Sequence, residues 1–222
     1  MGNKQVTAFR ESVVETDEVE AKNIINPSYV SSKATSLTAK CSLSGKVEYM
    51  DTSNNNEVIF KSNYKTTALG QQDVFFLDGK TDEKIMKLKC KQNITKDNVI
   101  HVYRYKSTYD GQEAAEDGTY LFAEIIISSK WDTSCKSVCS IVEAKDKQNI
   151  VYTTNKVAAM KFFAQLQTQT KLVGKMYEGP FASSTTILEV ASGTDMLMAA
   201  VMGSSVIAGG SSAGALAGAG VT

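Results

Sequence analysis

The side chains that could support catalysis are few and widely spaced. His101 is the only histidine, so a Ser-His-Asp or Cys-His arrangement must use it as the base. It stands in an alternating run with Tyr103 and Tyr105, where a histidine is more often a packed or surface strand residue than a general base. Cys135 and Cys139 have only lysines near them in the sequence, which gives little reason to expect reactive thiolates. The sequence therefore predicts a protein that is not an enzyme.

The pattern of cysteines and glycines predicts neither a metal nor a cofactor. The four cysteines include no CxxC pair, and zinc sites normally need closer ligand pairs. No glycine-rich loop stands between a strand and a helix, as phosphate binding would require. We therefore expect reduced thiols in an intracellular, cytoplasmic protein, with the membrane periphery as an alternative place. The balance of 24 basic and 24 acidic residues argues against a general nucleic-acid binder.

A group of basic residues is the polar feature with the clearest binding chemistry. Alternation along a strand puts Lys87, Lys89 and Lys91 on one face, with the apolar residues between them on the other. Such a stripe would attract anionic lipid headgroups at about 1 kcal/mol per residue. The alternative is that these lysines keep a β-barrel face solvated or blunt a strand edge. The candidate lipid-binding residues are Lys84, Lys87, Lys89, Lys91, Arg104 and Lys106.

These lysines belong to a long series of short strands between Pro27 and Val190. The whole chain has only two prolines, as expected where many backbone N–H groups join β ladders. Strands at this spacing, with turn signals between them, are typical of a sandwich or barrel. The segment Asn155–Gln169 is left open between helix and strand. The expected strands are 37–43, 47–50, 58–61, 74–77, 85–91, 99–105, 120–127, 137–144, 150–153, 171–177 and 185–190.

A hydrophobic helix is expected at about 195–208, with Thr194 or Asp195 as its N-cap. Every residue from Met196 to Ala208 is apolar or small, so the helix must be surrounded by protein or by lipid. The segment is shorter than the roughly 20 residues that cross a bilayer, which favours a buried helix and keeps a tail anchor as the alternative. The expected core residues of the helix are Met196, Leu197, Met198, Val201, Met202, Val206 and Ile207.

The two ends of the chain read differently from its centre. Residues 1–22 form a polar, acidic arm that we expect to be disordered, and 210–222 form a flexible Gly/Ala/Ser tail. One domain, 23–209, lies between them. Gly2 is a weak candidate for N-myristoylation, because Val6 stands where a Ser or Thr is usual.

Four stretches, in this order, resemble the plant LURP-one-related family within the wider tubby-like and phospholipid-scramblase-like fold. They are 47–51 with 57–61, then 74–79 leading to 85–88, then 99–104, and finally 173–177 running on to 188–197. The resemblance implies a closed antiparallel barrel, commonly of twelve strands, around a hydrophobic C-terminal helix. Tubby-like domains use surface basic residues for phosphoinositides, whereas the helix of scramblase-like proteins has been read as a membrane span. The long acidic loop Asp110–Gly118 and the Gly/Ala tail depart from the family pattern.

The sequence thus predicts a mainly β, non-catalytic binding module that engages anionic phospholipid or a membrane surface. A second hypothesis is a protein-interaction or regulatory, defence-related barrel whose acidic arm and acidic loop bind a partner protein. A third is a tail-anchored or scramblase-like membrane protein.

Overall fold

The computed structural model describes residues 7–9, 11–17, 23–42, 46–68, 71–91, 97–127, 136–156, 163–169, 171–178 and 185–207. Within them the chain forms a helical turn in the N-terminal arm, at 7–9 and 11, then a short 3-10 helix, twelve strands and helix α2. The elements are η2 (Pro27–Tyr29), β1 (Thr35–Cys41), β2 (Val47–Asp51), β3 (Glu57–Ala68), β4 (Gln71–Asp78), β5 (Lys84–Lys91), β6 (Asn98–Arg104), β7 (Tyr120–Ile127), β8 (Lys136–Ala144), β9 (Lys147–Lys156), β10 (Phe163–Gln167), β11 (Leu172–Glu178), β12 (Thr185–Val190) and α2 (Met196–Ile207).

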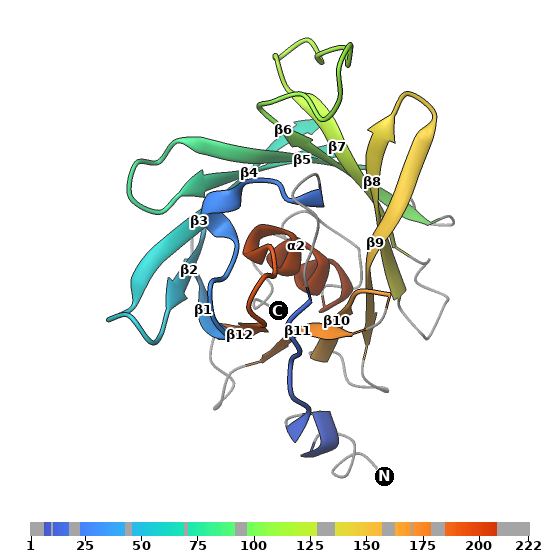
Figure 1. Cartoon of the computed structure of the whole chain (residues 1–222). Helices are drawn as coiled ribbons and strands as arrows, with labels where there is room; N and C mark the ends of the chain where they lie inside the picture. The colour runs from blue at the N-terminus through green and yellow to red at the C-terminus, as the bar shows by residue number, and fades with distance from the viewer. Residues whose placement is uncertain are drawn as a thin grey trace.

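The strands form one closed antiparallel barrel (Figure 1). Each strand pairs with the next one in the sequence, and β12 returns to pair with β1 between Thr35↔Val190 and Lys40↔Thr185. Closure gives each of these strands a neighbour on both sides, so their ladder hydrogen bonds are made within the sheet. The predicted closed barrel around a C-terminal helix is confirmed.

The ambiguous segment Asn155–Gln169 supplies two stretches of strand. Its start completes β9, and Phe163–Gln167 forms β10, which bridges β9 and β11. Residues 157–162 lie outside the described part of the chain. The strand at Phe163–Gln167 therefore closes the sheet between β9 and β11.

Alternation along the strands directs one set of side chains to the interior. In β6, for example, Ile100 and Val102 are buried, while Val99, His101 and Tyr103, which alternate with them, are half-exposed. Strands β2, β3 and β4 contribute the aromatic rings of Tyr49, Phe60 and Phe76. The centroids of Tyr49 and Phe60 lie 4.5 Å apart, and those of Phe60 and Phe76 lie 6.0 Å apart.

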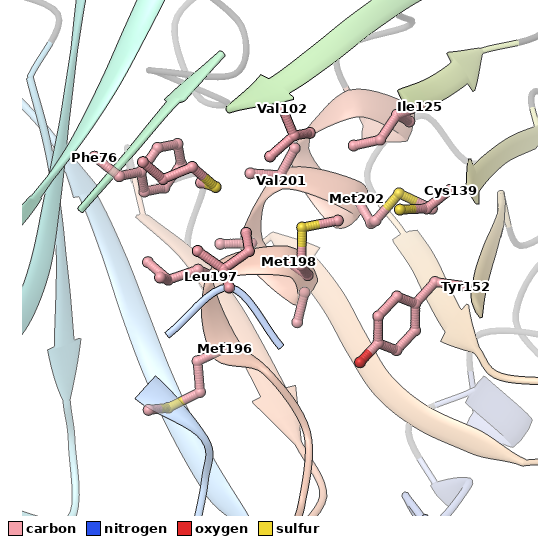
Figure 2. Packing of buried hydrophobic residues seen from close by; sticks show 14 of the residues in the cluster. Phe76, Val102, Ile125, Cys139, Tyr152, Met196, Leu197, Met198, Val201 and Met202 are labelled. Carbon is pink, nitrogen blue, oxygen red and sulfur yellow. The ribbon is translucent and has the colours of Figure 1, made fainter. Parts of the chain in front are cut away.

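Helix α2 fills the rest of the interior and packs against β7 to β12. Figure 2 shows its side chains among those of the surrounding strands, with Met202 beside Cys139 of β8. The helix approaches β11 closely at Gly203, where a Cβ atom would lie 2.5 Å from the Met176 sulfur. The predicted core residues Met196, Leu197, Met198, Val201 and Met202 are all at most 8% exposed. The side chains of Val206 and Ile207 lie outside the described part.

The N-cap of α2 falls on Asp195 rather than on Thr194. Its buried Oδ1 accepts hydrogen bonds from the backbone N–H groups of Leu197 (3.0 Å) and Met198 (3.2 Å). Its Oδ2 accepts from the N–H of Ile25 at 2.8 Å, which ties the segment before β1 to the helix. Burial raises the pKa of this carboxyl to about 6, although the three N–H groups oppose the rise. Thr194 instead donates from Oγ1 to the Val173 carbonyl at 3.4 Å.

The N-terminal arm requires a correction. We expected 1–22 to be disordered, but 7–9 and 11–17 pack against the barrel, with Phe9 only 2% exposed. In Figure 1 this blue segment leads from the N-terminus past β10 and β11. Gly2 and the tail 210–222 lie outside the described residues.

Among the described helices, none combines the length and apolar character needed to span a membrane.

Candidate functional site on the outer face of strands β4 to β6

Strand β5 carries most of the predicted lysines, and its neighbours fix what surrounds them. Met86, Leu88 and Cys90 are buried in the core, so Lys87 and Lys89 point to the outside of the barrel. Two rows of residues cross this outer face: Phe75–Lys87–Tyr103 and Asp73–Lys89–His101. We call the side chains of these two rows, together with Lys84, the lysine–aromatic face.

Lys87 does not belong to an exposed basic stripe, which corrects the prediction made from alternation. Its side chain is 9% exposed, and its Nζ lies 2.6 Å from Asp117 Oδ2 and 3.0 Å from Asp73 Oδ2. Asp117 comes from the acidic loop between β6 and β7, which thus covers Lys87. In the second hypothesis this loop binds a partner protein; in the structure its Asp117 makes an internal ion pair with Lys87.

The electrostatics of this site favour the charged forms of Lys87 and Asp117. Burial by itself lowers the pKa of Lys87, but hydrogen bonds to Asp117 and Asp73 outweigh it, so the pKa is raised overall. The pKa of Asp117 is held well below its usual range, first by the hydrogen bond from Lys87 and then by that from Thr119. A lysine that already balances two carboxylates has little charge left to offer a ligand.

Lys84 and Lys89 are the two cations of this face that keep their charge available. The Nζ of Lys84 lies over the Phe75 ring, 5.0 Å from its centroid, and the Nζ of Lys89 lies 5.0 Å from the centroid of Tyr103. Neither forms an ion pair with an acid among the residues that the structure describes. Lys84 is exposed and Lys89 half-exposed. A ring face orients a cation without neutralising it.

The remaining candidates lie apart from this pair. Arg104 is half-buried, stacks on Phe122, and donates to the carbonyls of Ile24 (3.4 Å) and Ser107 (2.6 Å). It therefore fastens the segment before β1 rather than facing a ligand. Lys106 is exposed, and the side chain of Lys91 lies outside the described part.

His101 lies on the same outer face. Its Nε2 is 3.3 Å from Glu124 Oε1 of β7, and its ring meets Tyr103 edge-on at 6.4 Å between centroids. The described cysteines Cys41, Cys90 and Cys139 are thiols without a disulfide. Burial raises the pKa of Cys90 to about 12, so this thiol stays protonated at neutral pH.

Sequence reasoning missed a second covered lysine, Lys175 of β11. It points outward but is 3% exposed, because the N-terminal arm lies over it. The signal available in the sequence was a lysine between apolar residues of a strand, Val173-Gly174-Lys175-Met176. That signal gives the face of the strand but not what covers it.

Comparison with known proteins adds little to this geometry. No family model matches the chain, and no curated protein matches it. Among solved structures, the chain is similar to a protein of Arabidopsis thaliana known from its X-ray structure, with a TM-score of 0.48 and 13% sequence identity. That match covers 79% of this chain and 90% of the Arabidopsis chain. A likeness at this level says nothing about function.

Proposed function

We propose that this protein is a non-catalytic binding module that engages an anionic membrane surface through Lys84 and Lys89. The observation that carries the proposal is the position of these two ammonium groups over Phe75 and Tyr103, without an acidic partner among the described residues. Each such lysine contributes about 1 kcal/mol of attraction near an anionic leaflet. The rings beside them are half-exposed and suit the boundary between water and lipid headgroups.

The filled interior supports recognition from the outside. Helix α2 and the aromatic rings of β2 to β4 occupy the space that other barrels use for a ligand. The resemblance of four sequence stretches to tubby-like proteins points the same way, since those domains use surface basic residues for phosphoinositides. Membership of that family remains a prediction.

Co-sedimentation with vesicles tests the proposal. The probes are vesicles of phosphatidylcholine alone and of phosphatidylcholine mixed with phosphatidylserine. Wild-type protein is expected to bind the mixed vesicles and to be released by salt, because screened charges attract weakly. The double variant Lys84→Glu, Lys89→Glu is expected to bind about 30-fold more weakly, from about 1 kcal/mol for each lost lysine.

A matched control makes the same charge change elsewhere. Lys40 and Lys46 are exposed and lie at β1 and β2, away from β5 around the barrel. Lys40→Glu, Lys46→Glu is expected to retain vesicle binding. If both double variants bind the anionic vesicles as the wild type does, or if both lose binding equally, the lysine–aromatic face is not the membrane site.

A further inference from the structure

The N-terminal arm follows β11 in one constant register. Lys175 Nζ donates to the Ser12 carbonyl at 2.7 Å, and Lys171 Nζ donates to the Thr16 carbonyl at 2.7 Å. Between them, the Glu15 N–H donates to the Leu172 carbonyl at 2.7 Å. Across these three pairs, the residue number rises along the arm by as much as it falls along β11. The arm therefore runs antiparallel to β11.

An irregularity in the sheet leaves a place for the central contact. The β10–β11 pairing passes from Leu166↔Gly174 to Gln167↔Leu172, so one residue of β11 has no opposite number. At this bulge the Leu172 carbonyl turns to the arm. A bulge that redirects a backbone group is a common device at binding sites.

One side chain of the arm provides the anchor. The Phe9 ring is 2% exposed and packs edge-on against Tyr177, with 5.8 Å between centroids. Lys175 Nζ lies 5.8 Å from the centroid of the same ring and 2.9 Å from Glu189 Oε2. Tyr177 also donates a hydrogen bond to Glu189. An aromatic ring thus covers the buried Lys175, which is paired with the half-buried Glu189.

The other side chains of the arm contribute little. Val13 is 77% exposed, and Glu11, Glu15 and Thr16 are exposed as well. Asp17 adds a side-chain contact, by accepting a hydrogen bond from Thr168. The barrel therefore holds this segment mainly through its main chain and one aromatic ring. Recognition of that kind tolerates many sequences.

We propose that this part of β11 and its neighbours is a docking site for a peptide of a partner protein, with the chain's own arm as the resident occupant, whose helical turn at 7–9 and 11 leads into an extended stretch. The site comprises Thr168, Lys171, Leu172, Lys175, Tyr177 and Glu189. The partner peptide supplies an aromatic side chain, followed three residues later by an extended stretch whose carbonyls meet the two lysines. This site is separate from the lysine–aromatic face, so each proposal can fail alone.

Local concentration adds to the contacts that hold the arm in place. The backbone–backbone hydrogen bond contributes about 0.5–1.5 kcal/mol net and each lysine-to-carbonyl bond about 1.5–3 kcal/mol, and a tethered segment competes in addition at an effective concentration in the millimolar range. Weakening the tethered arm should therefore open the site to a peptide in solution.

Fluorescence anisotropy with full-length protein tests the proposal. The probe is a labelled synthetic peptide of residues 7–17, TAFRESVVETD. Phe9→Asp in the protein places a charge at the buried anchor and is expected to raise its affinity for the peptide at least about tenfold over wild type. Val13→Asp makes the same change at an exposed arm residue and is expected to bind as the wild type does. Glu15→Pro removes the N–H that bonds Leu172 and opens the site independently, should Phe9→Asp fail to fold.

Two further variants locate the bound peptide. Lys175→Met, added to Phe9→Asp, is expected to abolish binding, as is a peptide in which Phe9 is replaced by Ala. The proposal is overturned if opened and wild-type proteins bind the peptide equally, or not at all. It is also overturned if Lys175→Met leaves binding unchanged, because the peptide would then lie elsewhere.

Discussion

Two lysines on the outside of the barrel, Lys87 and Lys175, are both buried, but different segments of the chain cover them. They are 7% and 3% exposed. Each points away from the core, and each forms an ion pair with an acid of an adjacent strand, Asp73 of β4 or Glu189 of β12. Each is then covered by a segment that is not part of the barrel wall.

The two covers differ in what they bring. The loop between β6 and β7 brings a second carboxylate, that of Asp117, whereas the arm brings the Ser12 carbonyl and the Phe9 ring. A carboxylate neutralises the charge of a buried ammonium, and this contact requires an acidic side chain at one position. A carbonyl is available in every peptide. The loop is therefore a fixed part of this chain's surface, while the arm occupies a place that another peptide can fill.

The largest difference between the two lysines is expected when each is replaced. Lys87→Met leaves Asp73 and Asp117 facing each other without a cation, and we expect the free energy of unfolding to fall by about 3 kcal/mol. Lys175→Met leaves Glu189 alone, still 30% exposed and hydrogen-bonded by Tyr177, so the loss is expected to be about 1 kcal/mol. Urea denaturation at neutral pH measures both.

A neutral triad provides the control for that result. Lys87→Met combined with Asp73→Asn and Asp117→Asn removes all three charges and is expected to recover most of the lost stability. If the triple variant is as unstable as Lys87→Met alone, packing rather than charge explains the loss. The comparison of the two lysines would then lose its electrostatic basis.

Asp195 shows what happens to a buried carboxyl that has no ion pair with a cation among the described residues. Its pKa of about 6 lies above the ordinary value of 3.8 for an aspartic acid, so the folded state binds the proton more tightly than the unfolded state. Stability from this group is therefore greatest below the unfolded pKa and falls as the pH rises through the folded one. Between roughly pH 4.5 and pH 7 the expected loss is about 2 kcal/mol.

Asp195→Asn separates this effect from other titrations. The variant is expected to lack the loss of stability over that pH range, whatever its absolute stability, because an amide does not ionise. Urea denaturation at several pH values measures the two slopes. Equal slopes for wild type and Asp195→Asn would mean that the carboxylate is not what titrates.

The features that the sequence predicted correctly are those that depend on regular local patterns. Alternation put Lys87 and Lys89 on the face opposite the core residue Leu88, and the uniformly apolar run from Met196 placed a helix inside the barrel. The number of twelve strands was predicted from the family resemblance, because the sequence pattern of Asn155–Gln169 did not decide between helix and strand. Phe163–Gln167 pairs with β9 and β11, and this long-range pairing decides its conformation over local helix propensity.

The features that the sequence could not give depend on contacts between distant residues. Alternation showed which way Lys87 points. Its partner Asp117, however, lies 30 positions away in a loop without regular secondary structure, whose course a sequence pattern does not predict. Likewise, the acidic composition of the arm predicted disorder. Phe9 and hydrogen bonds from Lys171 Nζ and Lys175 Nζ to arm carbonyls, which join residues 155 and 163 positions apart, place the arm on the barrel.

Local hydrogen exchange gives the finest test of the difference between arm and loop. Phe9→Ala is expected to speed exchange of the Glu15 amide about tenfold, because about 1.5 kcal/mol of ring burial no longer opposes local opening. The Ala115 amide of the loop, bonded to the Thr119 carbonyl at 2.7 Å, should not respond. Asp117→Ala should produce the reverse pattern. If Phe9→Ala instead speeds exchange throughout the strands, the arm opens only with the whole barrel, and a place that opens only on global unfolding cannot serve as an exchangeable docking site.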